Sequence, residues 1–276
     1  MMKLEQDTRL TCTENSELSA RFQGALHPDW QVWFPNGGYM SAMLLRAGAE
    51  FSTFDRPLSF SCHFLSVPSV GEVDIDVKRL RATRFAESLS ISLCQGGKVI
   101  IQALMWIGAP TDGYEHDDAG MPNVPSVEKC RATIDIKGGH ASHPFWNMIE
   151  QRPTTGDLHW QISKSGRAEQ RDWIRFLPEG QSGDSVMDVA RYIVLLDTYA
   201  WPAAARAHAG DGRFIAPTLS LHVDFHRPYD GTWFLSDASA PVGADGYIGA
   251  ANRLWSEKGQ LLASSNATLM CRPRPA

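Results

Sequence analysis

The clearest alternation of apolar and polar side chains in the chain begins at Thr218. Leu219, Leu221, Val223 and Phe225 share one face of an extended chain, whereas Thr218, Ser220, His222, Asp224 and His226 share the other. This period of two predicts a strand over 218–225. Further strands are predicted over 58–65, 72–80, 88–94, 99–107, 232–238, 246–255 and 261–270.

A helical pattern precedes each set of strands. Residues 38–49 are rich in Ala, Leu and Met, which favour helices, and they follow Gly37. Glycine at Gly37 and Gly38 would let another element approach the start of this helix closely. Residues 185–208 place apolar side chains at nearly helical spacing and predict a longer second helix. Trp-rich, strand-like segments lie ahead of the two helices, at 20–34 and 159–177.

The two sets of elements also carry short matching blocks in the same order. A Leu-Ser pair, a Phe, a Pro and a Gly within 58–71 recur within 219–231, at an offset of about 161 residues. A Gly followed by a turn into apolar residues at 97–100 recurs at 259–262. We therefore predict an α+β protein built from a duplicated unit, in which an antiparallel sheet wraps one helix.

The domain boundaries follow from the segment 110–139, which is rich in Pro, Gly and Asp. This segment is expected to link a first unit over 1–109 to a second unit over 140–276.

Composition narrows the class of protein. The chain has 276 residues, 43% of them hydrophobic, a formal net charge of -5 and five cysteines without a C-x-x-C pair. A core is therefore expected, reduced cytoplasmic thiols are favoured over a disulfide frame, and nucleic acid is disfavoured as a partner. Neither a membrane span nor an N-terminal signal segment is expected from the hydropathy pattern.

One carboxylate, Asp197, falls inside the apolar stretch of the second predicted helix. Burying a carboxylate without a partner is costly, so it must reach the surface, a hydrogen-bond donor or a cleft. Two interpretations remain open: an exposed helix face, or a general base in a cleft that activates water.

Histidines raise a separate possibility of metal binding. His222, Asp224 and His226 share the polar face of the strand at 218–225, and His140 and His143 lie just after the linker. A solvated or subunit-facing strand surface is the alternative for the first group, because no third ligand from elsewhere is evident. We expect no metal and no cofactor. The chain also has no G-x-S-x-G elbow, Walker motif or Rossmann glycine pattern.

Several blocks resemble the acyl-CoA thioesterase II family, over roughly residues 18 to 273. Trp33 to Tyr39, with Gly37 and Gly38 before a helix of small residues, is similar to the opening of a thioesterase hotdog unit, and 56–68 is similar to the strand after it. Asp197, Thr218, 225–228 and 259–272 resemble the second unit. The resemblance implies a double hotdog fold, a small-molecule acyl-CoA substrate and a homodimer or higher oligomer.

The resemblance also implies a site. In that family an Asp on the second helix, a Thr or Ser on the next strand and a Gln on the last strand hold the hydrolytic water. Asp197 and Thr218 match the first two positions, but an ungapped comparison places Ala267 at the third. The neighbouring Asn266 is the candidate substitute, although adjacent strand residues face opposite sides unless a bulge intervenes. Backbone N–H groups at a helix start, near Gly37 and Gly38 or near Gly183, are expected to donate to the thioester oxygen.

Three functions follow from these observations. Hydrolysis of an acyl-CoA thioester by water held on Asp197 and Thr218 is the leading hypothesis. A protein that binds acyl-CoA or another acyl ligand without turnover is the second, because Ala267 lacks a polar group. A hotdog dehydratase is the third, but it would require a His–acid pair near a helix, and His208 at a helix end is the single histidine in the predicted helices.

Overall fold

The computed structural model describes residues 2–139, 143–158, 161, 166–178, 184–209 and 211–274. The first half contains α1 (Lys3–Asp7), β1 (Thr11–Asn15), β2 (Ser19–Leu26), η1 (Pro28–Trp30), α2 (Gly37–Phe51), β3 (Arg56–Phe64), β4 (Gly71–Ala82), β5 (Ala86–Gln95) and β6 (Lys98–Gly108). Three short turns of 3-10 helix follow, η2 (Val127–Lys129), η3 (Thr133–Asp135) and η4 (Pro144–Met148). The second half contains β7 (Ile149–Pro153), β8 (Glu169–Phe176), α3 (Ser185–Thr198), α4 (Ala200–Arg206), β9 (Phe214–Ile215), β10 (Thr218–Phe225), β11 (Phe234–Ala244), β12 (Tyr247–Ser256), β13 (Leu261–Met270) and β14 (Arg272–Pro273).

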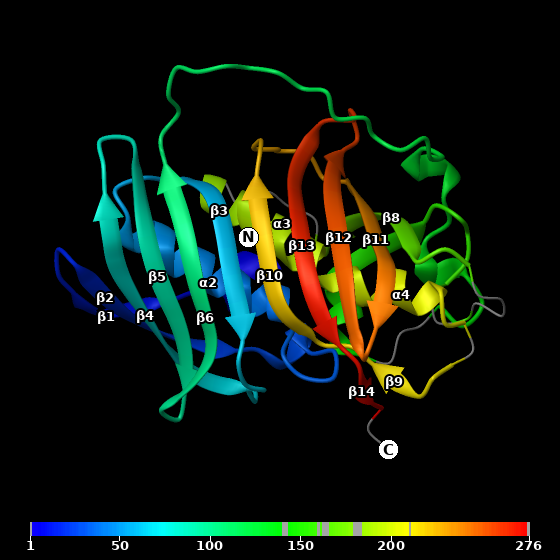
Figure 1. Ribbon diagram of the computed structural model, residues 1–276, viewed down its shortest axis with the longest axis horizontal. Helices are drawn as coiled ribbons and strands as arrows, with labels where there is room; N and C mark the ends of the chain where they lie inside the picture. Colours follow the sequence, from blue (N-terminus) through cyan, green and yellow to red (C-terminus); the bar gives the residue numbers. More distant parts are fainter. Residues whose placement is uncertain are drawn as a thin grey trace.

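One antiparallel sheet carries the described part of the fold. Its strand order is β1-β2-β4-β5-β6-β3-β10-β13-β12-β11-β8-β7, and β9 pairs separately with β14. Figure 1 shows α2, α3 and α4 behind this sheet and the segment after β6 arching over its upper edge. The described helices include none long and apolar enough to cross a membrane.

The two halves have the same strand order, and they meet at the β3–β10 pair. His222 of β10 pairs with Ser61 of β3, Ser220 pairs with His63, and Asp224 pairs with Ser59. Equivalent residues of the two strands are 161 apart in the sequence, so Ser61 pairs with its own equivalent, His222. The pairs on either side are related to each other by a half-turn, which places an approximate two-fold axis at Ser61 and His222. The predicted duplication of one helix and its antiparallel sheet is confirmed. The boundaries 1–109, 110–139 and 140–276 stay a prediction.

Two sequence-based expectations need correction. The single helix over 185–208 is instead two helices that meet at Tyr199. Pro202 explains the break, because it has no N–H for the carbonyl of Thr198 and its ring would clash there. The sequence pattern also missed β1, β7, β9 and β14, which are short or largely exposed. Part of the strand-like segment at 159–177 lies outside the described residues.

The helix α2 is buried on almost every side because the sheet covers one face and α3 covers another. Eleven of its fifteen residues are buried, which accounts for its Ala, Leu and Met content. The crossing with α3 is very close at Gly38. A Cβ built there would lie 2.6 Å from the Cα of Val194 and 2.8 Å from the carbonyl oxygen of Ile193. Both contacts are with backbone, so glycine sets the distance between the helices.

We expect Gly38→Ala to lower the free energy of unfolding by about 1–3 kcal/mol, because the added methyl group must push the two helices apart. The gain in helix propensity offsets part of this cost. Chemical denaturation measures the change. Gly249→Ala is the matched control, since a Cβ there meets nothing within 4 Å. Equal midpoints for the two variants would contradict the packing argument.

Candidate active site

The crossing of α2 and α3 places the carboxylate of Asp197, on α3, against the start of α2 and the start of β10. Its Oδ2 accepts a hydrogen bond from the N–H of Gly38 at 2.8 Å, and its Oδ1 accepts one from the hydroxyl of Thr218 at 2.9 Å. Asp197 is only 8% exposed. The carboxylate from α3 is therefore held jointly by the first turn of α2 and the first residue of β10.

Thr218 reaches Asp197 because β10 contains a bulge. The pairing with β13 shifts between Thr218 and Ser220, so Thr218 lies opposite the buried Leu269. Thr218 consequently faces the helices with Leu221, rather than the solvent with Ser220 and His222. The simple alternation expected from the sequence was wrong at this one position, and the extra residue of the bulge is the reason.

The N-terminus of α2 supplies the backbone donors at this site. Asn36 caps the helix by accepting the N–H of Tyr39 at 2.9 Å, and its amide donates to the hydroxyl of Thr198 at 3.3 Å. Asp197 takes the N–H of Gly38. Among the described residues, none accepts the N–H of Gly37, and a Cβ on Gly37 would lie 2.8 Å from Oδ2 of Asp197. Gly183, the other expected donor, lies outside the described residues.

Burial dominates the electrostatics of Asp197. Removal from water raises the pKa of this carboxyl to about 6, while the hydrogen bonds from Thr218 and Gly38 act in the opposite direction. Such a pKa leaves the group ionised at neutral pH and still able to accept a proton, as a general base requires.

The remaining candidates lie on opposite faces of β13. Ala267 is buried, pairs with Leu221 and faces the helices, as Thr218 does. Asn266 is exposed and pairs with His222 on the outer face of the sheet. The structure therefore brings Asp197, Thr218, Gly37 and Gly38 together and leaves the side chain of Asn266 on the other side of the sheet.

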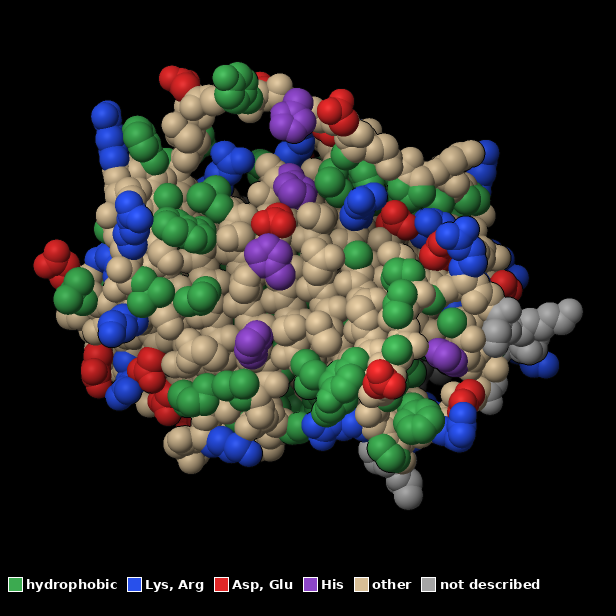
Figure 2. Space-filling model, viewed as in Figure 1, with side chains coloured by type: hydrophobic (Ala, Val, Ile, Leu, Met, Phe, Trp, Pro, Cys, Tyr) green, Lys and Arg blue, Asp and Glu red, His purple; other side chains and the backbone are tan. Residues whose placement is uncertain are grey.

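His222 of β10 and His226, directly after β10, belong to this outer face, which Figure 2 shows with several histidine side chains along its centre. Nδ1 of His222 lies 2.5 Å from the hydroxyl of Ser61, and Nε2 lies 3.3 Å from Asp224. His226 bonds to Ser264. These contacts agree with a solvated strand surface. His143 precedes η4 and lies beside Trp33, and His140 lies outside the described residues.

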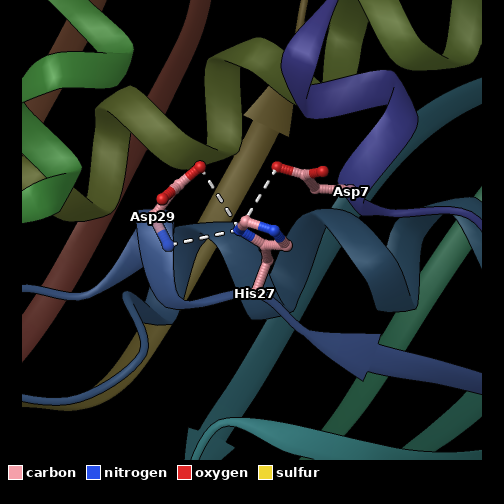
Figure 3. A group of neighbouring side chains, drawn as sticks. All are labelled: Asp7, His27 and Asp29. Atoms are coloured by element: carbon pink, nitrogen blue, oxygen red, sulfur yellow. Dashed lines mark hydrogen bonds and ion pairs between the residues drawn. The ribbon is translucent and has the colours of Figure 1, made fainter.

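Another group, Asp7, His27 and Asp29, has its ligand atoms within 4.8 Å of one another (Figure 3). A lysine supplies positive charge there, because Nζ of Lys3 lies 3.2 Å from both carboxylates. Nδ1 of His27 accepts the N–H of Asp29, and the indole of Trp30 donates to Asp7. The group thus ties α1 to the loop ahead of α2 as an ion-pair cluster.

A second buried carboxylate, Asp172 on β8, was missed from the sequence. It accepts hydrogen bonds from the amides of Gln151, at 2.7 Å, and Gln170, and burial raises its pKa to about 6. When the two halves are compared strand by strand, Asp172 on β8 takes the position that Phe22 takes on β2. The sequence offered little signal for it, because Asp172 stands among other polar and charged residues in the segment Glu169–Phe176.

A surface groove of about 470 Å³ lies beside α4, with Ala204, Ala240 and Ile248 among its lining residues. Neither Asp197 nor Thr218 lines it. The buried carboxylate, rather than the groove, therefore marks the candidate chemistry.

Comparison with known families shows which family the chain belongs to. The sequence profile named acyl-CoA thioesterase C-terminal domain matches residues 127–271, and the profile named acyl-CoA thioesterase N-terminal domain matches residues 26–108. The chain belongs to the acyl-CoA thioesterase family. As a member of this family it carries one matching domain in each half. A search of curated proteins finds no match.

Solved structures confirm the double hotdog fold. A hotdog protein from Alicyclobacillus acidocaldarius superposes with a TM-score of 0.82 at 19% identity, covering 100% of both chains. The acyl-CoA thioesterase II TesB2 of Mycobacterium marinum gives 0.79 at 18% identity, covering 98% of both chains. The tesB protein of Mycobacterium avium subs paratuberculosis gives 0.78 at 19% identity, again over 98% of both chains.

The cost of burying the carboxylate gives a test that is independent of activity. Because the pKa of Asp197 is raised from 3.8 to about 6, the folded protein binds the proton more tightly than the unfolded chain. Stability is therefore lost as pH rises through this interval. We expect Asp197→Asn to raise the free energy of unfolding by about 1–3 kcal/mol at about pH 8, where the carboxylate is ionised.

Denaturation of the wild type and of Asp197→Asn across this pH range measures the difference. It should shrink toward zero at about pH 4, where the wild-type group is protonated. Asp237→Asn is the control, because Asp237 forms a partly exposed ion pair with Arg171. A difference for Asp197→Asn that does not change with pH would contradict the assigned cause.

Proposed function

We propose that this protein hydrolyses acyl-CoA thioesters to a free acid and CoA, with Asp197 as the general base and Thr218 orienting the water. The observation that supports it most directly is the buried carboxylate held between Gly38 and Thr218. Membership of the family supplies the substrate class.

The proposed reaction needs no covalent intermediate. Water bound to Asp197 attacks the thioester carbonyl and gives its proton to the carboxylate. The negative charge that develops on the carbonyl oxygen lies at the start of α2, where the N–H of Gly37 and the helix dipole stabilise it. The tetrahedral adduct then expels the CoA thiolate, which takes the proton from Asp197. Gly38 acts indirectly, since its N–H holds the carboxylate.

Ala267 favours a second candidate, a protein that binds acyl-CoA with little or no turnover. It faces the helices next to the catalytic pair, where a methyl group offers neither a donor nor an acceptor to water. A water held by two partners is less well directed than a water held by three. Turnover of an acyl-CoA panel, measured together with the affinity for the same ligands, separates the two candidates.

The pH dependence of kcat tests the general base. The wild-type rate should rise with pH and level off above about 6, because only the ionised Asp197 accepts the proton. In Thr218→Ala the carboxylate loses a hydrogen bond that lowers its pKa. The rising limb should therefore move to higher pH while kcat falls. A limb that stays in place would show that the titrating group is not the partner of Thr218.

The inner face of β13 provides a gain-of-function test. We expect Ala267→Gln to raise kcat by as much as about a hundredfold, because the amide would fix the direction of the water. Asn266→Ala should leave kcat within about twofold, because Asn266 is exposed on the outer face. Loss of turnover in Asn266→Ala, without gain in Ala267→Gln, would place the third partner at Asn266 instead.

A further inference from the structure

We infer that the ribbon formed by β9 and β14 binds the phosphate groups of CoA through Arg272 and Arg274. This inference rests on the proposed function. The ribbon binds the nucleotide end of the substrate, whereas Asp197 and Thr218 act on its thioester end.

The ribbon is joined directly to the catalytic pair at both of its strands. β9 ends three residues before Thr218, and β14 begins three residues after Leu269, the partner of Thr218 across the sheet. The backbone of Pro217 accepts the N–H of Met270, which fixes the two connections together. At about 3.3 Å per residue, Arg272 and Arg274 lie roughly 10 to 17 Å along the chain from Leu269. An extended pantetheine arm separates the thioester of CoA from its phosphates by a comparable length.

Three guanidinium groups belong to one face of this ribbon. Arg272 pairs with Ile215, and the N–H of Arg274 donates to the carbonyl of Arg213, which continues the register. Cross-strand partners and residues two apart share a face, so Arg213, Arg272 and Arg274 project to the same side. Like charges directly opposite each other are unfavourable, as Arg213 and Arg274 are here.

One carboxylate offsets one of these charges. Asp211 binds Arg213 through both of its oxygens, at 2.8 and 2.6 Å. Arg272 and Arg274 are exposed, and among the described residues neither has a carboxylate partner. Within the part of the protein that the structure describes, a chain with a formal net charge of -5 thus has two arginines without a carboxylate partner beside its candidate site. Guanidinium groups bind phosphate oxygens in pairs, so these two suit a phosphate ligand.

Aromatic side chains complete the rim of this surface. Burial lowers the pKa of His143, and the positive charge of Arg274 acts in the same direction. His143 lies edge-on to the indole of Trp33, with ring centroids 5.9 Å apart. Trp33 precedes Gly37 by only four residues, so this aromatic pair lies close along the chain to the N-terminus of α2. An aromatic surface beside two arginines favours a nucleotide over a simple phosphate ester.

The test compares two thioesters of the same acyl group, one on CoA and one on N-acetylcysteamine, which has no phosphate. In the double variant Arg272→Ala, Arg274→Ala, KM for acyl-CoA should rise by about tenfold or more for each arginine. Its kcat should stay within about twofold, and the constants for the short thioester should not change. Lysine at both positions should restore part of the affinity, because it keeps the charge but not the paired hydrogen bonds.

Arg84→Ala is the matched control, because this arginine lies in the turn between β4 and β5, at the end of the sheet away from β9 and β14 (Figure 1). An unchanged KM for acyl-CoA in the double variant would overturn the inference. An equal loss for both thioesters would also overturn it, since that result indicates a structural role.

Failure of the proposed function has a different signature, in which the wild type turns over neither thioester. Calorimetric titration with CoA and with dephospho-CoA then replaces kinetics as the readout. Weaker CoA binding in the double variant supports the inference in that case. Equal CoA affinity of wild type and double variant overturns it.

Discussion

The close crossing of α2 and α3 is the contact on which the rest of the site depends. Without a side chain at Gly38, the backbone of α2 comes against that of α3 at Val194, and the N–H of Gly38 reaches Asp197. A wider crossing would leave the buried carboxylate with Thr218 as its remaining donor, at a cost of about 1.5–3 kcal/mol for the lost hydrogen bond to a charged group. The same residue therefore sets the helix packing and makes the ionised acid tolerable inside the protein.

The carboxylate is expensive even when it is well held. Burial outweighs the two hydrogen bonds that favour ionisation, which is why the pKa of Asp197 remains above its usual range. A structural role alone would be served better by an apolar residue at this position. A buried acid with a raised pKa beside a helix N-terminus is typical of sites that must move a proton near neutral pH.

Much of this arrangement was predictable from the chain. The strands 218–225 and 261–270 have the predicted bounds, and the repeat blocks predicted the two-fold relation between the halves. The bulge that turns Thr218 inward was not predictable, because it follows from the pairing of β10 with β13. The break at Tyr199 could have been predicted, because Pro202 stands within the helical pattern, but the apolar spacing outweighed it. Asp172 was missed because its partners, Gln151 and Gln170, come together only across strands.

The two-fold axis at Ser61 and His222 relates the central helix and the sheet strands of one half to those of the other. Asn36 and Asp184 are the equivalent caps of α2 and α3, so the counterpart of Asp197, thirteen residues after its cap, is Ala49. The counterpart of Thr218, at the register of the β3–β10 pair, is Pro57. Neither residue holds or activates water. The duplicated fold thus has two related contacts between its central helices but carries the acid at one of them. A tight thioester analogue should therefore bind with a stoichiometry of one molecule per chain.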